Sequence, residues 1–428
     1  MVDHQATIFA VSSGSPPAAI GVIRISGPRA KDALLTLAGR DFVPRQASLA
    51  RLRDPQGAVL DHALVLWFPG PRSATGEDCA ELHCHGGRAV LDAVQRSLSE
   101  IEGLRPAEEG EFTRRAFANG RIDLAEAEGL ADLLEAETEW QRASAIASAG
   151  GRLSSLIEGW RDASLRAAAE IEAALDFSDE DDVAQMPARF AEELDDLCAE
   201  IGELLDAPRS EKIKEGFRVV LAGPPNSGKS TLFNALTDSE AAITSPIAGT
   251  TRDVIERSVA IAGIPFSLVD TAGLREDGNE PIEAIGIARA RAELSRADCI
   301  LWLGPEGEGP SGAWEISTKS DDANAMQKAQ ADHVVSAVTG EGIGALKAAL
   351  VERARAVLPK PGEAALNARQ HARLAEAHAA LRAAGQQRDL LLIGEELRQA
   401  RLAFDRLIGR ATTEDMLDAL FSRFCIGK

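Results

Sequence analysis

The chain has 428 residues, of which 45% are hydrophobic and 26% are charged, a composition that excludes a disordered or fibrous protein. A chain of this length is expected to form two or three domains. Its 67 acidic and 46 basic side chains give a formal net charge of −21, which excludes an extended nucleic-acid-binding surface and leaves only local or shared contacts with nucleic acid.

The cysteines indicate a reducing compartment. They are odd in number and widely scattered, unlike the even, closely spaced cysteines of a small secreted domain. They are Cys79, Cys84, Cys198, Cys299 and Cys425. Residues 1–25 lack a basic segment before an apolar core, and no run reaches the ~18 apolar residues of a membrane span. We therefore expect a cytoplasmic protein with no signal peptide and no membrane contact.

The N-terminal part, from Ala6 to about Arg115, mixes short β-like runs with Gly and Pro. Ile20–Ile25 and Ala63–Phe68 are the clearest runs, and together they predict a small α+β domain. From Leu124 onward the composition shifts to Ala, Glu, Leu and Arg, which predicts long amphipathic helices. The apolar stripe of one such helix is assigned to Leu153, Leu156, Trp160, Ser164, Ile171 and Leu175.

A third change in pattern comes at Gly216, after an acidic run at Ser178–Asp182 that is expected to be a solvated turn. Phe217–Ala222 is a compact apolar strand that leads into a glycine-rich loop. After about Pro359 a helical stripe returns, at Leu397, Ala400, Phe404 and Leu407. The helical flanks predict an α/β domain inserted into a helical domain. The predicted bounds are 1–118 for the α+β domain, 119–215 and 358–428 for the helical domain, and 216–357 for the inserted domain.

The inserted segment carries a phosphate-binding loop. Gly223-Pro-Pro-Asn-Ser-Gly-Lys-Ser230 matches G-x-x-x-x-G-K-[ST] between a predicted strand and a helix expected from Thr231. Backbone N–H groups of such a loop surround phosphates, Lys229 supplies a positive charge, and the Ser230 hydroxyl ligates Mg²⁺. The predicted phosphate contacts are Asn226, Ser227, Gly228, Lys229, Ser230 and Thr231.

Two further segments complete the phosphate and metal site. In Ser267-Leu-Val-Asp-Thr-Ala-Gly273, Asp270 ends an apolar strand and is expected to hold the Mg²⁺ shell indirectly, with Gly273 donating its N–H to the γ-phosphate. In Gly249-Thr-Thr-Arg-Asp253, the Thr251 hydroxyl is expected to join the metal only with the γ-phosphate present, which defines a switch. The predicted contacts here are Ser245, Pro246, Ile247, Ala248, Gly249, Thr250, Thr251, Thr271 and Ala272.

Two loops are expected to select the base. In Thr318-Lys-Ser-Asp321, the Asp321 carboxylate can accept two hydrogen bonds from guanine, which adenine cannot supply. A second base-contacting loop is predicted after the short strand Asp332–Val335. The predicted base contacts are Thr318, Lys319, Asp321, Ser336, Ala337 and Val338. These features predict a GTPase, in which Leu274 stands where many regulatory GTPases have the glutamine that orients the attacking water.

Taken with these motifs, several blocks along the whole chain resemble the MnmE (TrmE) family. They are Gly21-Val-Ile-Arg-Ile-Ser-Gly27, Thr75-Gly-Glu-Asp78, His85-Gly-Gly87, Gly110-Glu-Phe-Thr113, Arg121-Ile-Asp-Leu-Ala-Glu-Ala-Glu128 and Phe424-Cys-Ile-Gly-Lys428. The resemblance implies a potassium-stimulated GTPase that modifies tRNA together with an FAD-dependent MnmG (GidA)-like partner, in a heterotetramer. The modification adds an aminomethyl or carboxymethylaminomethyl group to C5 of the wobble uridine.

The resemblance also implies ligands and roles for particular residues. It implies a homodimer formed by the N-terminal domain and a tetrahydrofolate derivative bound by Arg24, Glu81, Arg121 and Lys428. It implies a K⁺ ion held by Asn226, Ser245, Ile247 and Thr250, and a general base, Glu283, that acts through water. From the residues alone, Glu276, Glu280 and Glu283 are equally good candidates, and a solvated acidic face is the simpler interpretation.

The chain departs from the family pattern in three places. Arg121 stands where many members have lysine. Thr318 stands where the family usually has asparagine, and this second difference predicts weaker nucleotide affinity rather than lost specificity. Only about 14 residues separate the strand Cys299–Leu303 from Thr318, which is close to the minimum of about 10–12 residues for a crossover helix with its loops. A shortened or missing helix is therefore expected there.

Two cysteine-containing segments of the chain allow alternative interpretations. Cys79, His83, Cys84 and His85 are close in sequence, but their spacing matches no common zinc site, so a strand and turn is preferred. Cys425, near the C-terminus, is either a catalytic or an inert thiol. For the whole protein, the alternatives are a ribosome-assembly or RNA-chaperone GTPase without covalent chemistry and a regulatory scaffold with a structural folate site.

Overall fold

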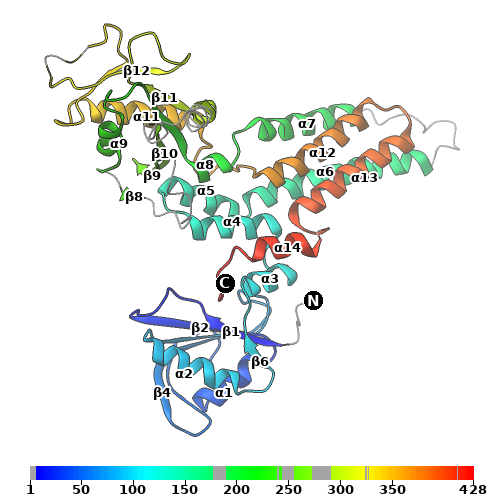
Figure 1. Cartoon of the computed structure of the whole chain (residues 1–428). Helices are drawn as coiled ribbons and strands as arrows, with labels where there is room; N and C mark the ends of the chain where they lie inside the picture. Colours follow the sequence, from blue (N-terminus) through cyan, green and yellow to red (C-terminus); the bar gives the residue numbers. More distant parts are fainter. Residues whose placement is uncertain are drawn as a thin grey trace, which may run out of the picture. The chain divides into compact units, whose positions relative to one another are not determined.

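The computed structural model describes residues 6–176, 189–238, 241–242, 255–271, 291–322, 325, 327–411 and 413–428 (Figure 1). The chain divides into two compact units, one of Met1–Ala131, Ser154–Gly159 and Leu402–Lys428, the other of Asp132–Leu153 and Trp160–Arg401. The N-terminal elements are β1 (Thr7–Val11), β2 (Ile20–Ser26), α1 (Ala30–Ala38), β3 (Ser48–Arg53), β4 (Val59–Phe68), β5 (Cys79–His85), α2 (Arg88–Ser99), β6 (Leu104–Pro106) and α3 (Glu111–Ala118). The predicted domain bounds stay a prediction.

The N-terminal strands form one six-stranded sheet in the order β3-β4-β5-β2-β1-β6. Successive side chains of a strand point to opposite faces. On one face Ile23, Ile25 and Leu82 are buried in a core that also contains Leu34 from α1 and Val94 from α2. The other face carries polar residues of β2 and β5. This arrangement confirms the predicted α+β domain.

A small apolar cluster joins α3 to the end of the chain. It contains Leu124 and Ala127 from α4 (Leu124–Glu135) and Phe421 from α14 (Glu414–Phe421), with Phe424 beyond the helix. The Phe421 ring also lies 6.2 Å, between centroids, from the ring of Phe117 on α3. The last residues of the chain therefore belong to the same unit as the N-terminal sheet.

The inserted domain is an α/β structure. Its strands are β7 (Phe217–Ala222), β8 (Ala241–Ala242), β9 (Ile255–Ile261), β10 (Ile264–Asp270), β11 (Cys299–Trp302), β12 (Trp314–Ser317) and β13 (His333–Val334), and its helices include α9 (Lys229–Thr237) and α11 (Ile343–Val357). The sheet order is β13-β12-β11-β7-β10-β9-β8, in which β7 pairs in parallel with both β10 and β11. The core includes Leu232 from α9 and Leu346 from α11. The predicted P-loop fold is confirmed.

The connection between β11 and β12 is short, as expected. Residues 303–313, all of which are described, contain no helix. Instead, the Trp302 indole N–H donates to the carbonyl oxygen of Pro305 at 2.8 Å. Nearby, the Lys328 ammonium lies 2.6 Å from a carboxylate oxygen of Glu315. Local side-chain bonds therefore close the loop that a crossover helix occupies in longer α/β units.

The remaining helices are α5 (Glu139–Ala149), α6 (Arg152–Asp176), α7 (Phe190–Asp206), α8 (Glu211–Glu215), α12 (Ala368–Gln386) and α13 (Leu390–Ile408). The predicted stripe of α13 is fully buried. In α6 the stripe is partly wrong, because Leu156 is exposed and Leu175 is only half-buried, while Ile157 and Ala174 are buried. No helix within the described ranges is both long and apolar enough to span a membrane.

The start of α5 forms hydrogen bonds with both segments that connect the inserted domain to the helices. The Trp140 indole N–H donates to the carbonyl oxygen of Pro359, just after α11, at 2.8 Å. The neighbouring Gln141 side chain donates to the carbonyl oxygen of Ile213, just before β7, at 3.3 Å. The Trp140 backbone N–H also bonds to the oxygen of Gly263, between β9 and β10. One helical turn thus holds the incoming segment, the outgoing segment and a hairpin of the domain.

Candidate functional site

The phosphate-binding loop lies between β7 and α9. Gly228, the residue before α9, has φ +95°, a left-handed conformation that glycine adopts without steric cost. The helix starts at Lys229, two residues earlier than expected. The Lys229 side chain is buried, and its Nζ donates to the carbonyl oxygens of Gly223 (2.9 Å) and Pro224 (2.7 Å). The loop therefore holds the ammonium group among oxygen acceptors at its centre.

The two residues expected at the magnesium ion are in direct contact. The Ser230 hydroxyl donates to Oδ2 of Asp270 at 2.7 Å. Asp270 is 1% exposed and ends β10, which runs parallel to β7, so both strands finish at the same edge of the sheet. Next to Asp270, the Thr271 hydroxyl donates to the carbonyl oxygen of Leu221 at 2.8 Å, which fixes the end of β10.

The first predicted base-selecting loop is bound to the phosphate-binding loop by two side chains. The Thr318 hydroxyl donates to the carbonyl oxygen of Ser227 at 2.9 Å, and the Lys319 ammonium donates to that of Asn226 at 3.1 Å. Thr318 therefore makes a contact to the loop backbone although its side chain is short. Asp321 is exposed at the end of this loop, where its carboxylate can accept bonds from a base.

The second base loop is held by Glu341. Its backbone oxygen accepts from the N–H of Ser336, which is completely buried, and its carboxylate accepts from the Ser320 hydroxyl at 3.1 Å. This contact joins the two predicted base loops, and nothing in the local sequence indicated it. Ala337 is half-buried, and Val338 is exposed.

Several predicted site residues lie outside the described residues. They are the residues from Ser245 to Thr251, together with Ala272, Gly273, Leu274, Glu276, Glu280 and Glu283, and the acidic run Ser178–Asp182. The expected switch, the general base and three of the four expected potassium ligands belong to this set.

In the N-terminal unit, two of the four expected folate residues form an ion pair. Arg24 and Glu81 are directly opposite each other on β2 and β5, and Nε and Nη2 of Arg24 lie 3.1 and 2.9 Å from Oε1 of Glu81. Their side chains are 27% and 19% exposed. Nε2 of His83 lies 3.3 Å from the other Glu81 oxygen, and the guanidinium carbon of Arg24 lies 5.9 Å from the centroid of the Phe112 ring. Charged and polar side chains and one aromatic ring thus lie together on the open face of the sheet.

The other two expected folate residues belong to the same unit. Arg121 is exposed and follows α3, and its side chain lies against Gly76. Lys428 is half-buried at the chain end and follows Gly427, whose carbonyl oxygen accepts from the Ser12 hydroxyl at 2.7 Å.

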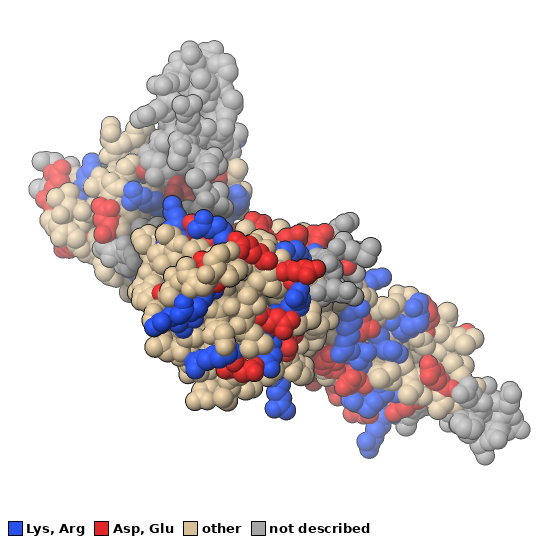
Figure 2. Space-filling view, turned by 90° about the horizontal axis from the view of Figure 1, so that it is seen from below, with Lys and Arg blue, Asp and Glu red and all other residues tan. Residues whose placement is uncertain are grey.

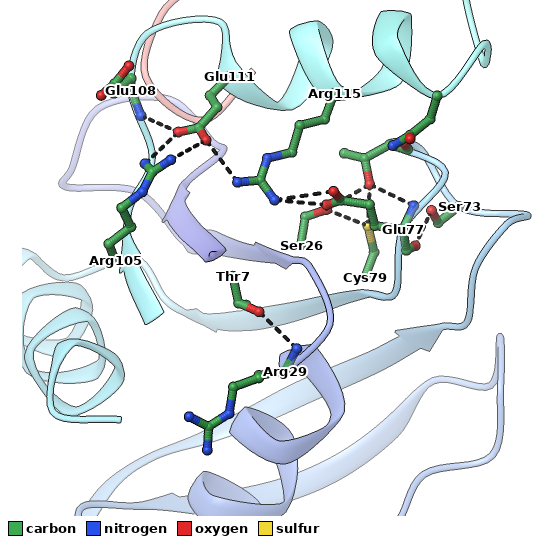
Figure 3. A network of polar contacts seen from close by, with 12 residues as sticks. Thr7, Ser26, Arg29, Ser73, Glu77, Cys79, Arg105, Glu108, Glu111 and Arg115 are labelled. Atoms are coloured by element: carbon green, nitrogen blue, oxygen red, sulfur yellow. Dashed lines mark hydrogen bonds and ion pairs between the residues drawn. The ribbon is translucent and has the colours of Figure 1, made fainter. Parts of the chain in front are cut away.

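A buried chain of charged groups lies on the same face of the sheet as Arg24, and the sequence did not reveal it (Figure 3). Arg115 on α3 is completely buried, and it donates to Glu111 at 2.9 Å and to Glu77 at 3.0 Å. Glu111 also accepts from Arg105 at 2.6 Å, and Glu77 accepts from the Ser26 hydroxyl at 2.7 Å. Burial raises the pKa of Glu111, but bonds from Arg105, the Glu108 N–H and Arg115 lower it more, so its pKa lies below the usual value.

The cysteine and histidine residues of β5 do not face one direction. Strand alternation places Cys79, His83 and His85 on one face and Cys84 on the other, within the core. Burial, with the nearby charge of Asp61, raises the pKa of the Cys84 thiol to about 12, so it is held as an unreactive thiol. Cys425 is a free, exposed thiol.

Comparisons with known proteins agree with this geometry. Residues 7–121 match the family model "GTP-binding protein TrmE N-terminus", and residues 124–425 match "MnmE helical domain". Relatives named tRNA modification GTPase MnmE are 63% identical in Erythrobacter litoralis and 49% in Zymomonas mobilis, each over 99% of this chain and 100% of the relative. A relative of the same name in Novosphingobium aromaticivorans is 59% identical over 99% of both chains. The chain therefore belongs to the MnmE (TrmE) family of tRNA modification GTPases.

Proposed function

We propose that this protein hydrolyses GTP and, with an FAD-containing partner similar to MnmG, adds an aminomethyl or carboxymethylaminomethyl group to C5 of the wobble uridine of certain tRNAs. The observation that carries the proposal is the meeting of Lys229, Ser230 and Asp270 at one edge of the inserted sheet. The names of the relatives, tRNA modification GTPase, support the wider role. We expect the protein to act in the cytoplasm, where tRNA is modified.

The residues of the phosphate-binding loop fit a nucleotide with magnesium. The Ser227 hydroxyl oxygen is buried and has no hydrogen-bond partner in the described structure, although buried polar atoms are nearly always paired. An anionic ligand in the loop would supply an acceptor. Ser230 and Asp270 offer the hard oxygen ligands that Mg²⁺ prefers. When bound, the ion would neutralise negative charge that develops on the phosphates.

Five residues of the inserted domain have a defined role in this proposal. With a nucleotide bound, Lys229 would exchange its bonds to loop carbonyl oxygens for phosphate oxygens, Ser230 would ligate Mg²⁺, and Asp270 would hold the shell of the ion. Thr251 would join that shell only when the γ-phosphate is present. Asp321 selects guanine, since a carboxylate accepts two bonds that adenine cannot donate.

We further propose that K⁺ is bound by Asn226 with Ser245, Ile247 and Thr250 and takes the place of an arginine finger, while Glu283 positions the attacking water. Support comes from Asn226, which is exposed in the loop with φ +62°. At fixed ionic strength, GTP hydrolysis should be faster in K⁺ than in Na⁺, and Asn226→Ala should remove most of the difference. Asn234→Ala, on the exposed side of α9, is the matched control. Equal rates in the two salts for the unaltered protein would refute this role.

The N-terminal unit is proposed to bind a tetrahydrofolate derivative through Arg24, Glu81, Arg121 and Lys428. Carboxylates of a folate would attract the cations, and Glu81 can accept from the amino edge of a pterin. Glu81→Ala should therefore weaken binding of 5-formyltetrahydrofolate and leave GTP binding unchanged, as measured by calorimetry. Equal loss of both ligands would indicate misfolding instead.

We propose that the protein is a homodimer formed through this unit. On the sheet face opposite α1 and α2, Leu49 of β3 and Leu64 of β4 stand opposite each other and are 68% and 39% exposed. An exposed apolar pair of this kind favours contact with another protein surface. Leu49→Asp should shift the sedimentation of the protein towards the monomer, whereas Leu35→Asp, at an exposed site on α1, should not.

Contact with tRNA is proposed to be local. On the face seen in Figure 2, basic and acidic side chains are interspersed and leave broad uncharged areas. Small clusters of basic side chains, rather than an extended positive surface, would therefore contact the tRNA phosphates, and the partner would supply further contacts. The decisive experiment is nucleoside mass spectrometry of tRNA from cells that lack this protein. Unchanged wobble uridines would favour a ribosome-assembly or RNA-chaperone GTPase instead.

A further inference from the structure

The last four residues of the chain are fixed to the N-terminal sheet by specific contacts. Ser12, just after β1, donates its hydroxyl to the carbonyl oxygen of Gly427 at 2.7 Å, and Ile426 forms a backbone bridge with Glu109. Gly427 has φ +99°, and a side chain there would collide with the carbonyl oxygen of Val11. Only glycine therefore allows the terminal segment to approach β1 this closely.

The helix before this segment is fixed as well. Arg114 on α3 forms ion pairs with Glu414 and with Asp418 of α14, the latter at 2.7 Å. On the buried side of α14, Phe421 packs into the cluster shared with Phe117 of α3. An apolar contact and a double ion pair thus hold α14 on α3, and α14 leads directly to the terminal residues.

The docked segment contacts the continuation of β1, and β1 pairs with β2, the strand that carries Arg24. In the register of β1 and β2, Ala10 is opposite Arg24, and the next residues of β1 lead into the contacts with Gly427. The helix α3 also reaches this pair, because its Phe112 ring lies 5.9 Å from the Arg24 guanidinium carbon. The same helix therefore contacts α14 on one side and the open face of the sheet on another.

We propose that Ser12, Gly427 and Arg114 are positioning residues, which hold the C-terminal segment in place as one wall of the ligand-binding face around Arg24 and Glu81. The proposal rests on the folate site proposed above. A terminal segment that is already fixed does not have to be ordered when the ligand binds, so the affinity for a ligand with carboxylates is higher. Loosening the segment should lower folate affinity without changing the nucleotide site, which belongs to the other unit.

The first experiment measures docking without any folate. Carboxypeptidase B removes a C-terminal lysine, and intact-mass spectrometry follows the loss of Lys428. Ser12→Ala removes one hydrogen bond, so the lysine should be released about five times faster. Arg114→Glu should also speed release, and the triple variant Arg114→Glu, Glu414→Arg and Asp418→Arg should slow it again by restoring the ion pairs. Equal release rates in all four proteins would overturn the docking.

The second experiment measures binding of 5-formyltetrahydrofolate by calorimetry. Gly427→Ala should lower affinity at least about tenfold, because the new side chain would collide with the Val11 carbonyl oxygen and alanine is strained at this positive φ. Gly39→Ala is the matched control, because Gly39 has a similar positive φ of +67° but open space around it. GTP affinity should be unchanged in both variants.

The outcomes separate the two proposals. If the unaltered protein binds no folate, the proposed folate site is wrong and the positioning role falls with it. If the unaltered protein binds folate and Ser12→Ala and Gly427→Ala bind it equally well, the site stands and the positioning role is wrong. Lower affinity in these two variants alone, with Gly39→Ala unaffected, supports it.

Discussion

Replacing Arg115 by methionine tests the buried charge network most directly. Arg115 is completely buried, and its terminal nitrogens bond to Glu77 and Glu111. Breaking a buried ion pair by removing one partner costs about 3–5 kcal/mol, because a charge is left without compensation. We expect about 3 kcal/mol, the low end of that range, because Arg105 still pairs with Glu111 and Glu77 is partly exposed.

Hydrogen exchange is the suitable assay, because a chain with several domains does not unfold in one transition. A loss of about 3 kcal/mol should speed exchange of the most protected amides of β2 and β5 about 150-fold. Amides of β7 and β10, in the other unit, are the internal control. Removing both charges, in Arg115→Met with Glu111→Leu, should cost less than the single change. Unchanged protection in Arg115→Met would refute the stabilising role.

Three further predictions concern single side chains. Asp321→Asn should relax guanine specificity by placing an amide donor opposite the ring N–H, and unchanged GTP affinity in a fluorescence titration would show that the base loop is misassigned. Thr318→Ala should weaken GTP binding about fivefold by removing the hydroxyl bond to Ser227, whereas Thr318→Ser should bind normally. Glu111 has a lowered pKa in the fold, so its contribution to stability is complete above its ordinary value of 4.5 and is lost as the pH falls through the lower folded value. Hydrogen exchange of the β2 and β5 amides, relative to those of β7 and β10, should show that loss as the pH is lowered in the unaltered protein and a smaller one in Arg115→Met.

Features that depend on neighbouring residues could be predicted from the sequence. The strand Phe217–Ala222, the loop that follows it and the missing helix after Trp302 are each defined within about ten to twenty positions, because turn chemistry and loop length act locally. The stripe of α6 was partly wrong because Leu156 and Ile157 are equally apolar neighbours. Only tertiary contacts decide which of the two faces the core.

Contacts between distant positions could not be predicted. Ser12 and Gly427 are 415 positions apart, and Arg114 and Glu414 are 300 apart, so no periodic pattern connects them. Arg114 and Arg115 are adjacent and chemically identical. Yet one pairs with exposed carboxylates of α14 and the other is completely buried. The direction in which each points from α3 determines that difference, and α3 is oriented by the whole unit.

The attachment at the start of α5 makes the nucleotide domain a separable module. Trp140 and Gln141 are consecutive residues, and they bind the segments that leave and enter that domain. The two chain ends that excision of the domain would create therefore already lie at one helical turn and need only a short link to be rejoined. For the same reason, a related nucleotide domain could replace this one without a change in the helices, provided that its two ends reach that turn.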